Sequence, residues 1–202
     1  GKLTILYSKR DDSGQVVTAK LIDQSYDKCY RITSSELVKN YHLSVNTPAS
    51  EELKLVLKNL TITPAEAIAP IQINGESQVI TYLEGENKIS INKSEKSSSR
   101  FTVSPAGISV AKGAKLTIDN EPGQQGSIEV LNNTNTNVDR SGAAIGGNGE
   151  QDAGIIHIKG GTVSATSASK GAAIGASVGK SVEEIRISGG NVTAKSSGGA
   201  GI

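Results

Sequence analysis

Residues 142–170, GAAIGGNGEQDAGIIHIKGGTVSATSASK, and residues 171–199, GAAIGASVGKSVEEIRISGGNVTAKSSGG, align without a gap at a spacing of 29. Twelve of the 29 aligned positions are identical, and apart from one serine all twelve are glycine, alanine, isoleucine or valine. Most charged positions differ between the two copies. A repeat that keeps its small and branched residues while its charges vary is typical of structural units that stack on one another.

Each copy contains two short stretches with period-two alternation, I-x-I and V-x-A, joined by Gly-Gly. Such alternation of branched residues predicts strands, and Gly-Gly predicts a turn between them. A 29-residue unit with so few large side chains has no core of its own. We therefore expect an all-β solenoid of parallel strands, in which Ile156 lies over Ile185 and Val163 lies over Val192.

The alternation continues upstream in less regular form, over residues 53–64, 69–75, 79–92, 101–119 and 126–132. The stretches KLTILYS and QVVTAKLIDQSY predict two strands around a DDSG turn. We interpret residues 1–28 as an N-terminal β cap or the end of a preceding domain. Residues 29–202 are predicted to be a parallel β-helix, with irregular coils over 29–141 and regular coils over 142–202, truncated at the C-terminus.

Residues 175–181, GASVGKS, come close to the phosphate-binding loop G-x-x-x-x-G-K-[ST]. Counting back five residues from Gly179 reaches Ile174, where that motif requires glycine. The motif also needs a buried strand before it and a helix after it, and residues 164–170 are small and polar. The string therefore predicts a variable turn of the repeat rather than a nucleotide site.

The stretches LKLVLKNLTI, AGISVAKGAKLTI, GAAIGGNG, IHIKGGTVSA, IRISGGNVTA and GGAGI resemble the repeats of right-handed parallel β-helix proteins of bacterial surfaces, which carry GAGIGG…ITI-GGTVTA units. The resemblance covers roughly residues 30–202. It implies a right-handed parallel β-helix, a secreted or cell-surface location, and a role as an adhesin, a carbohydrate-binding domain or a lyase-like fold. The chain departs from the enzymatic members because it lacks their charged site.

Charge and composition disfavour several classes of partner. The chain has 21 Lys and Arg against 20 Asp and Glu, a net charge of +1, which gives no reason to expect nucleic acid as a partner. It has no apolar run of about 18 residues, so we expect no membrane insertion. The single Cys29 leaves no internal disulfide, and the only histidines, His42 and His157, lack the neighbouring ligands of a zinc site. We expect no metal and no cofactor.

Cleavage of a polysaccharide by hydrolysis needs two carboxyl groups about 5–9.5 Å apart. In the regular half the candidates are Glu150, Asp152, Glu183 and Glu184. All four fall in the variable turn, and the seven aspartates are too scattered for a calcium-dependent lyase. We therefore expect no catalytic residue in this chain. A polysaccharide-active enzyme whose active residues lie partly outside the chain is the alternative hypothesis.

The leading hypothesis is a non-catalytic surface or secreted module that binds an extracellular glycan or a host protein, or serves as an adhesin stalk. The candidate ligand-binding residues on the predicted strand faces are His157, Arg186, Asn191 and Thr193. Tyrosines near the N-terminus add rigid amphipathic rings, and the candidates there are Tyr26, Tyr30 and Tyr41. Ice binding through Thr and Ser ladders is a further alternative, disfavoured because Arg186 and Lys195 interrupt the array.

Overall fold

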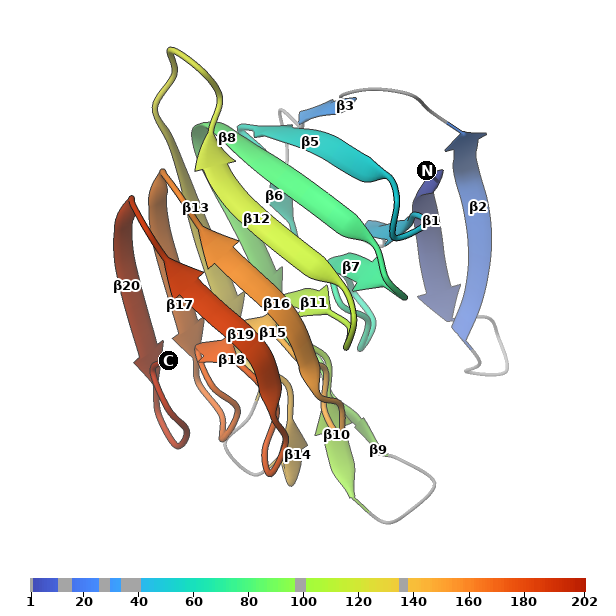
Figure 1. Ribbon diagram of the computed structural model, residues 1–202. Helices are drawn as coiled ribbons and strands as arrows, with labels where there is room; N and C mark the ends of the chain where they lie inside the picture. Colours follow the sequence, from blue (N-terminus) through green and yellow to red (C-terminus); the bar gives the residue numbers. More distant parts are fainter. Residues whose placement is uncertain (1, 11–15, 26–29, 34–40, 97–100, 135–137) are drawn as a thin grey trace.

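The computed structural model describes residues 2–10, 16–25, 30–33, 41–96, 101–134 and 138–202 (Figure 1). Every regular element in this part of the chain is a β-strand. The strands form curled sheets, mostly of parallel neighbours, whose inward side chains meet in a core. The predicted all-β class is therefore confirmed for the described residues.

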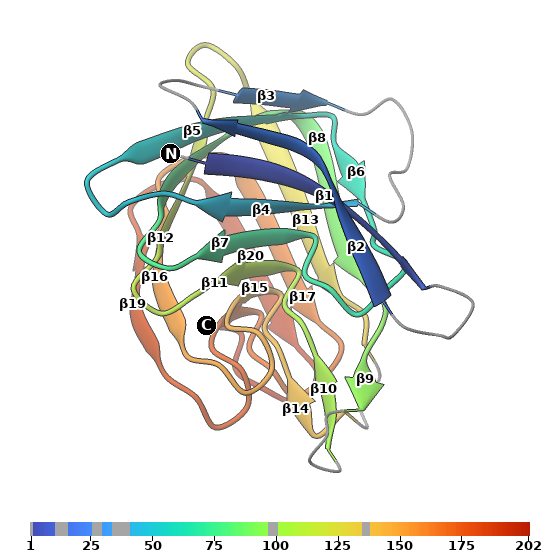
Figure 2. The ribbon, with the colours of Figure 1, turned by 90° about the vertical axis from the view of Figure 1, so that its right-hand side faces the viewer.

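Sheet A has seven strands in the order β18-β15-β11-β7-β4-β1-β2. They are β1 (Lys2–Arg10), β2 (Val16–Ser25), β4 (Tyr41–Asn46), β7 (Ile71–Asn74), β11 (Ile108–Val110), β15 (Ile145–Gly146) and β18 (Ile174–Gly175). The strands from β4 to β18 are parallel, whereas β1 pairs antiparallel with both β4 and β2. Figure 2 shows β4, β7, β11 and β15 one beneath another.

The long strand β8 (Gln78–Ile91) joins two further faces, because its two halves pair with different strands. We call the strands along its first half sheet B: β3 (Tyr30–Thr33), β5 (Glu52–Lys58), β12 (Lys115–Asn120), β16 (Ala153–Ile158) and β19 (Val182–Ile187). We call those along its second half sheet C: β6 (Thr61–Ile62), β13 (Gly126–Asn132), β17 (Thr162–Ser167) and β20 (Asn191–Ser196). A small sheet D contains β9 (Glu95–Lys96), β10 (Thr102–Ser104) and β14 (Arg140–Ser141).

The 29-residue spacing of the sequence repeat sets the strand pairing in all three large sheets. The Cα partners, one pair from each sheet, are Ile145 and Ile174, Ile156 and Ile185, and Val163 and Val192. Each pair is 29 residues apart, as the gapless alignment predicts. The two copies of the repeat therefore lie in register as adjacent parallel strands.

The irregular half of the chain follows the same order of sheets. Ile108 pairs with Ile71 on one side and with Ile145 on the other, and Leu116 pairs with Ile156. These spacings are longer than 29 because the loops between the strands are longer. Loop length therefore varies while the inward positions remain aligned.

Inward aliphatic side chains from sheets A, B and C meet in one core. Ile145, Ile156 and Val163 have no exposed surface and belong to the same buried cluster. Each such side chain contributes about 1.5–3 kcal/mol through its removal from water. The core thus consists of branched residues that the repeat keeps, and the outer faces carry the positions that vary.

The Gly-Gly pairs form the turns between sheets B and C. Gly161 and Gly190, the second glycine of each pair, have φ values of +81° and +82°. Glycine adopts this left-handed conformation without the steric cost that a Cβ brings. The two turns also contact each other, because the backbone N–H of Asn191 donates to the carbonyl of Gly161 at 2.9 Å.

The two strands predicted near the N-terminus are present as β1 and β2, and the intervening residues 11–15 lie outside the described residues. Parallel pairing begins at β3, where Tyr30 pairs with Leu55. This is close to residue 29, the predicted start of the coils. The division of the chain into residues 1–28 and 29–202 stays a prediction.

Candidate functional site

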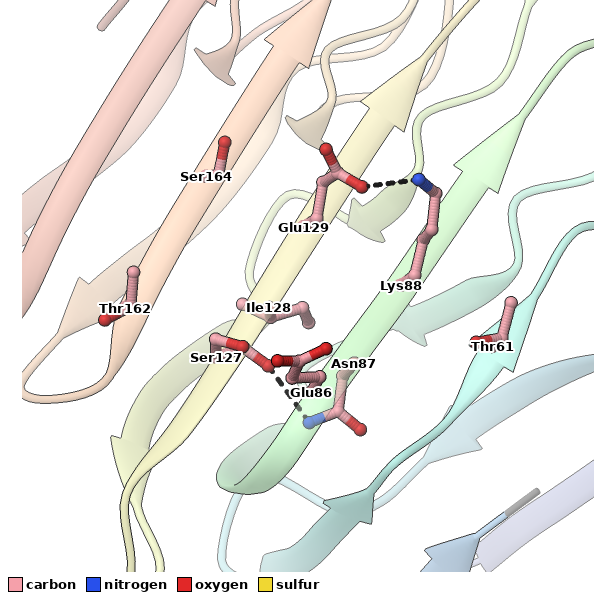
Figure 3. Close-up of a pocket in the computed structure, with 9 residues that line it drawn as sticks. All are labelled: Thr61, Glu86, Asn87, Lys88, Ser127, Ile128, Glu129, Thr162 and Ser164. Carbon is pink, nitrogen blue, oxygen red and sulfur yellow. Dashed lines mark hydrogen bonds and ion pairs between the residues drawn. The ribbon is translucent and has the colours of Figure 1, made fainter. Parts of the chain in front are cut away.

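A groove of about 440 Å³ lies on the outer face of sheet C (Figure 3). It is open to solvent and crosses β6, β8, β13 and β17. We call it the sheet-C groove, and its lining residues are Thr61, Glu86, Asn87, Lys88, Ser127, Ile128, Glu129, Thr162 and Ser164. Its volume falls in the range of about 300–1,000 Å³ that is usual for ligand sites.

Strand alternation explains why this face is polar. Successive side chains of a strand point to opposite sides of the sheet. Ile89, Val130 and Ala165 point inward and are fully buried. The residues just before them in sequence, among them Lys88 and Glu129, therefore point outward.

The charges in the sheet-C groove are unequal. The Lys88 Nζ lies 2.7 Å from the Glu129 Oε2, and both side chains are about half exposed. Figure 3 shows these two side chains reaching toward one another from neighbouring strands. Glu86 is exposed, and its carboxylate has no ion pair within the described part of the chain. The groove therefore carries one uncompensated negative charge.

The floor of the groove is held by a buried amide. Asn87 is 2% exposed, and its Oδ1 accepts a hydrogen bond from the backbone N–H of Leu60 at 2.9 Å. Its Nδ2 donates to the carbonyl of Ser127 at 3.1 Å. Because this side chain ties β8 to the loop before β6 and to β13, the strands that carry the outward residues keep a fixed spacing.

A second, shallower hollow of about 290 Å³ adjoins the groove at the turns between sheets B and C. It shares Thr162 with the groove and includes Asn120 and Asn191. The two hollows meet at Thr162, and no charged side chain lines the second one.

The structure divides the strand residues predicted to bind a ligand between two faces. Asn191 and Thr193 lie on β20 in sheet C, where they pair with Thr162 and Ser164 of the groove. His157 and Arg186 pair with each other in sheet B, which is a different face. These four residues therefore do not form one site.

The His157 side chain contacts a carboxylate on the neighbouring strand. Its Nε2 lies 3.0 Å from the Glu184 Oε1, and the His157 side chain is 14% exposed against 49% for Glu184. The pair links β16 to β19. His157 is thus engaged in a contact between strands.

The tyrosines do not form a common contact surface among the described residues. Tyr26 lies outside the described residues. Tyr30 is half-buried and packs against the core, and Tyr41 is half-buried on β4. Of the candidate rings, Tyr30 therefore stabilises the fold at the start of sheet B.

The carboxylates weighed as catalytic residues in the regular half each have a partner within the fold. Glu150 lies 3.8 Å from the Arg140 Nε, and Glu183 accepts a hydrogen bond from the Gly113 N–H at 3.1 Å. Asp152 accepts from the Ser181 N–H at 3.0 Å. This bond, aided by the charges of nearby lysines, lowers the pKa of Asp152 below its ordinary value of 3.8. With Glu184 held by His157, these groups support turns and strand contacts.

The GASVGKS stretch forms the turn between β18 and β19. The N–H of Val178 donates to the carbonyl of Ser141, and the N–H of Lys180 donates to the carbonyl of Ser177. A strand, not a helix, follows Ser181. The N–H groups of Val178, Lys180 and Ser181 are therefore used within the fold.

Sequence reasoning missed Glu86, Lys88 and Glu129, the three charged residues of the groove. They lie in the irregular half, where Lys88 and Glu129 are paired at a separation of 41 rather than 29. Alternation in ENKISI and SIEVLN indicates that they point outward. It does not indicate that they are neighbours, because that depends on the length of the intervening loop.

The sequence assigns no ligand role to Cys29 or His42. Cys29 lies outside the described residues. His42 is 4% exposed, and burial lowers its pKa from 6.5, so it is neutral at pH 7.

No group of three or more metal-ligating side chains occurs among the residues the structure describes. Within those same residues no helix is long and apolar enough to cross a membrane.

Comparisons of the chain with protein-family models, with curated proteins and with solved structures find no match.

Proposed function

We propose that this chain is a right-handed parallel β-helix that acts as a non-catalytic binding module for an extracellular glycan, with the sheet-C groove as its binding surface. The constant offset of 29 in three sheets supports a coiled arrangement. The observation that carries the glycan assignment is the groove itself. It is open, and four of its nine lining residues carry hydroxyl groups, which both donate and accept hydrogen bonds as sugar hydroxyls do.

A module of this kind acts outside the cytoplasm, so the proposal includes a secreted or bacterial cell-surface location. It also fits a role as an adhesin, in which a rigid stack of strands holds a ligand-binding face away from its attachment. Binding to a host protein rather than to free glycan is an outcome that the experiment below distinguishes.

The test uses the whole chain, residues 1–202, on an array of glycans and of glycosylated and deglycosylated host proteins. Ser164→Trp places a bulky ring in the groove, and Lys54→Trp places the same ring at an exposed position of sheet B as a matched control. We expect binding to glycans and glycosylated proteins, reduced at least about tenfold by Ser164→Trp alone. Binding to deglycosylated protein only, or loss in neither variant, contradicts the proposal.

A polysaccharide-active enzyme is the second candidate, because Glu86 and Glu129 both project into the groove from neighbouring strands. The ion pair between Glu129 and Lys88 favours a structural role for one of the two carboxylates. Incubation with pectin, alginate and glycosaminoglycans should give no new reducing ends and no unsaturated products. Product formation that Glu129→Gln abolishes would favour the enzyme instead.

A further inference from the structure

Two rows of outward side chains run across the strands of sheet C. The first, which we call the Glu86 row, consists of Glu86, Ser127, Thr162 and Asn191. The second, the Lys88 row, consists of Thr61, Lys88, Glu129, Ser164 and Thr193. In both rows each residue is the Cα partner of the next, and paired strands lie about 4.8 Å apart. The Lys88 row therefore extends over about 19 Å at right angles to the strands.

The chemistry of the two rows favours a neutral ligand. Six of their nine members carry hydroxyl or amide groups, which donate and accept hydrogen bonds. Of the three charged members, Lys88 and Glu129 neutralise each other at 2.7 Å. Glu86 remains as an acceptor for ligand hydroxyls, and its charge repels a polyanion.

We propose that the sheet-C groove binds a linear, neutral polysaccharide that lies across the strands, with one sugar residue over each strand. This inference rests on the glycan-binding function proposed above. A pyranose residue in an extended β-1,4-linked chain advances by nearly the distance between paired strands. Each successive sugar therefore lies over one strand and meets polar side chains of these rows, first on β6 and last on β20.

Two of the strands that carry the rows, β8 and β13, are linked to each other before any ligand binds. The buried amide of Asn87 connects β8 to β13 beneath the groove, and the Lys88–Glu129 pair connects the same strands above it. Strands that are already linked lose little freedom on binding. Asn191 and Thr193 extend this fixed surface by one strand beyond the groove itself.

The length of the ligand provides the test. Calorimetric titration of the 1–202 chain with β-1,4-linked gluco-, manno- and xylo-oligosaccharides of two to eight residues should show affinity rising with each added sugar. For the best series the affinity should level off at about five residues, the number of strands in the Lys88 row. Thr193→Ala should lower the affinity for the five-residue ligand by about threefold to tenfold and move the plateau to about four residues. Lys54→Ala on sheet B should change neither value.

The outcomes separate this inference from the proposed function. If glycans bind but affinity does not depend on length beyond two residues, or Thr193→Ala has no effect, the arrangement across the strands is wrong while the binding function stands. If polygalacturonate or chitosan binds more tightly than every neutral chain, the neutral assignment is wrong. If no glycan binds at all, the proposed function itself fails.

Discussion

Ile158 and Ile187 are Cα partners on β16 and β19, yet Ile158 has no exposed surface whereas 43% of Ile187 is exposed. Both belong to the I-x-I stretch of the repeat, and both point to the inner side of sheet B. β19 is the last strand of that sheet in the structure, so Ile187 is covered from one side only. The same position of the repeat therefore contributes differently to the free energy of unfolding in its two copies.

The two isoleucines should differ in their contribution to stability. Ile158→Ala leaves a cavity in the core and should lower the free energy of unfolding by about 2–5 kcal/mol. Ile187→Ala removes a half-exposed side chain and should lower it by less than about 1.5 kcal/mol. Urea denaturation followed by circular dichroism measures both values. Equal losses would show that the inner side of β19 is as well packed as that of β16.

Two glycines of the repeat should respond differently to alanine. A Cβ at Gly146, where φ is +135°, would collide with the carbonyl oxygen of Gly175 on the neighbouring strand. Gly146→Ala should therefore reduce stability by more than about 3 kcal/mol or prevent folding. Gly179 has φ of +67° with no atom within 4 Å of an added Cβ, so Gly179→Ala should cost only about 1–2 kcal/mol. The soluble yield and thermal midpoint of both variants check this order.

The turn that contains Asp152 should make stability depend on pH. The pKa of Asp152 is lowered in the folded state, chiefly by the hydrogen bond from the Ser181 N–H, so its contribution is present above its ordinary value of 3.8 and is lost as pH falls through the folded pKa. Asp152→Asn should therefore lower the thermal midpoint at about pH 7 but have little effect at a pH below the folded pKa, where the wild-type carboxyl is also neutral. A difference that stays constant over this range contradicts the assignment.

Of the adjacent residues Asn132 and Asn133, folding should depend on Asn132. It is fully buried, its Nδ2 donates to the carbonyls of Pro105 and Gly142, and its Oδ1 accepts from Thr134. Asn132→Ala leaves these groups without partners and should cost about 2–4 kcal/mol. Asn133→Ala, on the exposed side, should cost less than about 0.5 kcal/mol. Guanidinium denaturation of both variants provides the measurement.

The sequence allowed the parallel pairing of the regular half to be predicted, because two copies of equal length leave one gapless alignment. Ile156 over Ile185 follows directly from it. The groove could not be predicted in the same way, since Lys88 and Glu129 become neighbours through loops of unequal length. Alternation determines which side of a strand a residue occupies, whereas loop length determines which strand lies beside it.

The candidate residues predicted on the strands lie on different sheets for a related reason. Arg186 and Thr193 both point outward, and in sequence they are separated by one Gly-Gly turn. That turn carries the chain from sheet B to sheet C, so the two residues lie on different faces. A row of outward side chains therefore forms within a single sheet. Two residues belong to the same row only when they lie the same number of positions from the turn in their own copies of the repeat.

The offset of 29 is the same in sheets A, B and C, so one 29-residue segment of the chain supplies one strand to each of these sheets. An in-frame duplication of residues 142–170 would add one strand to each of these sheets at once and leave the remaining partners matched. Unequal recombination within the gene therefore offers a simple route to longer variants, in which the outer faces of the sheets grow by whole increments without redesign of the interior.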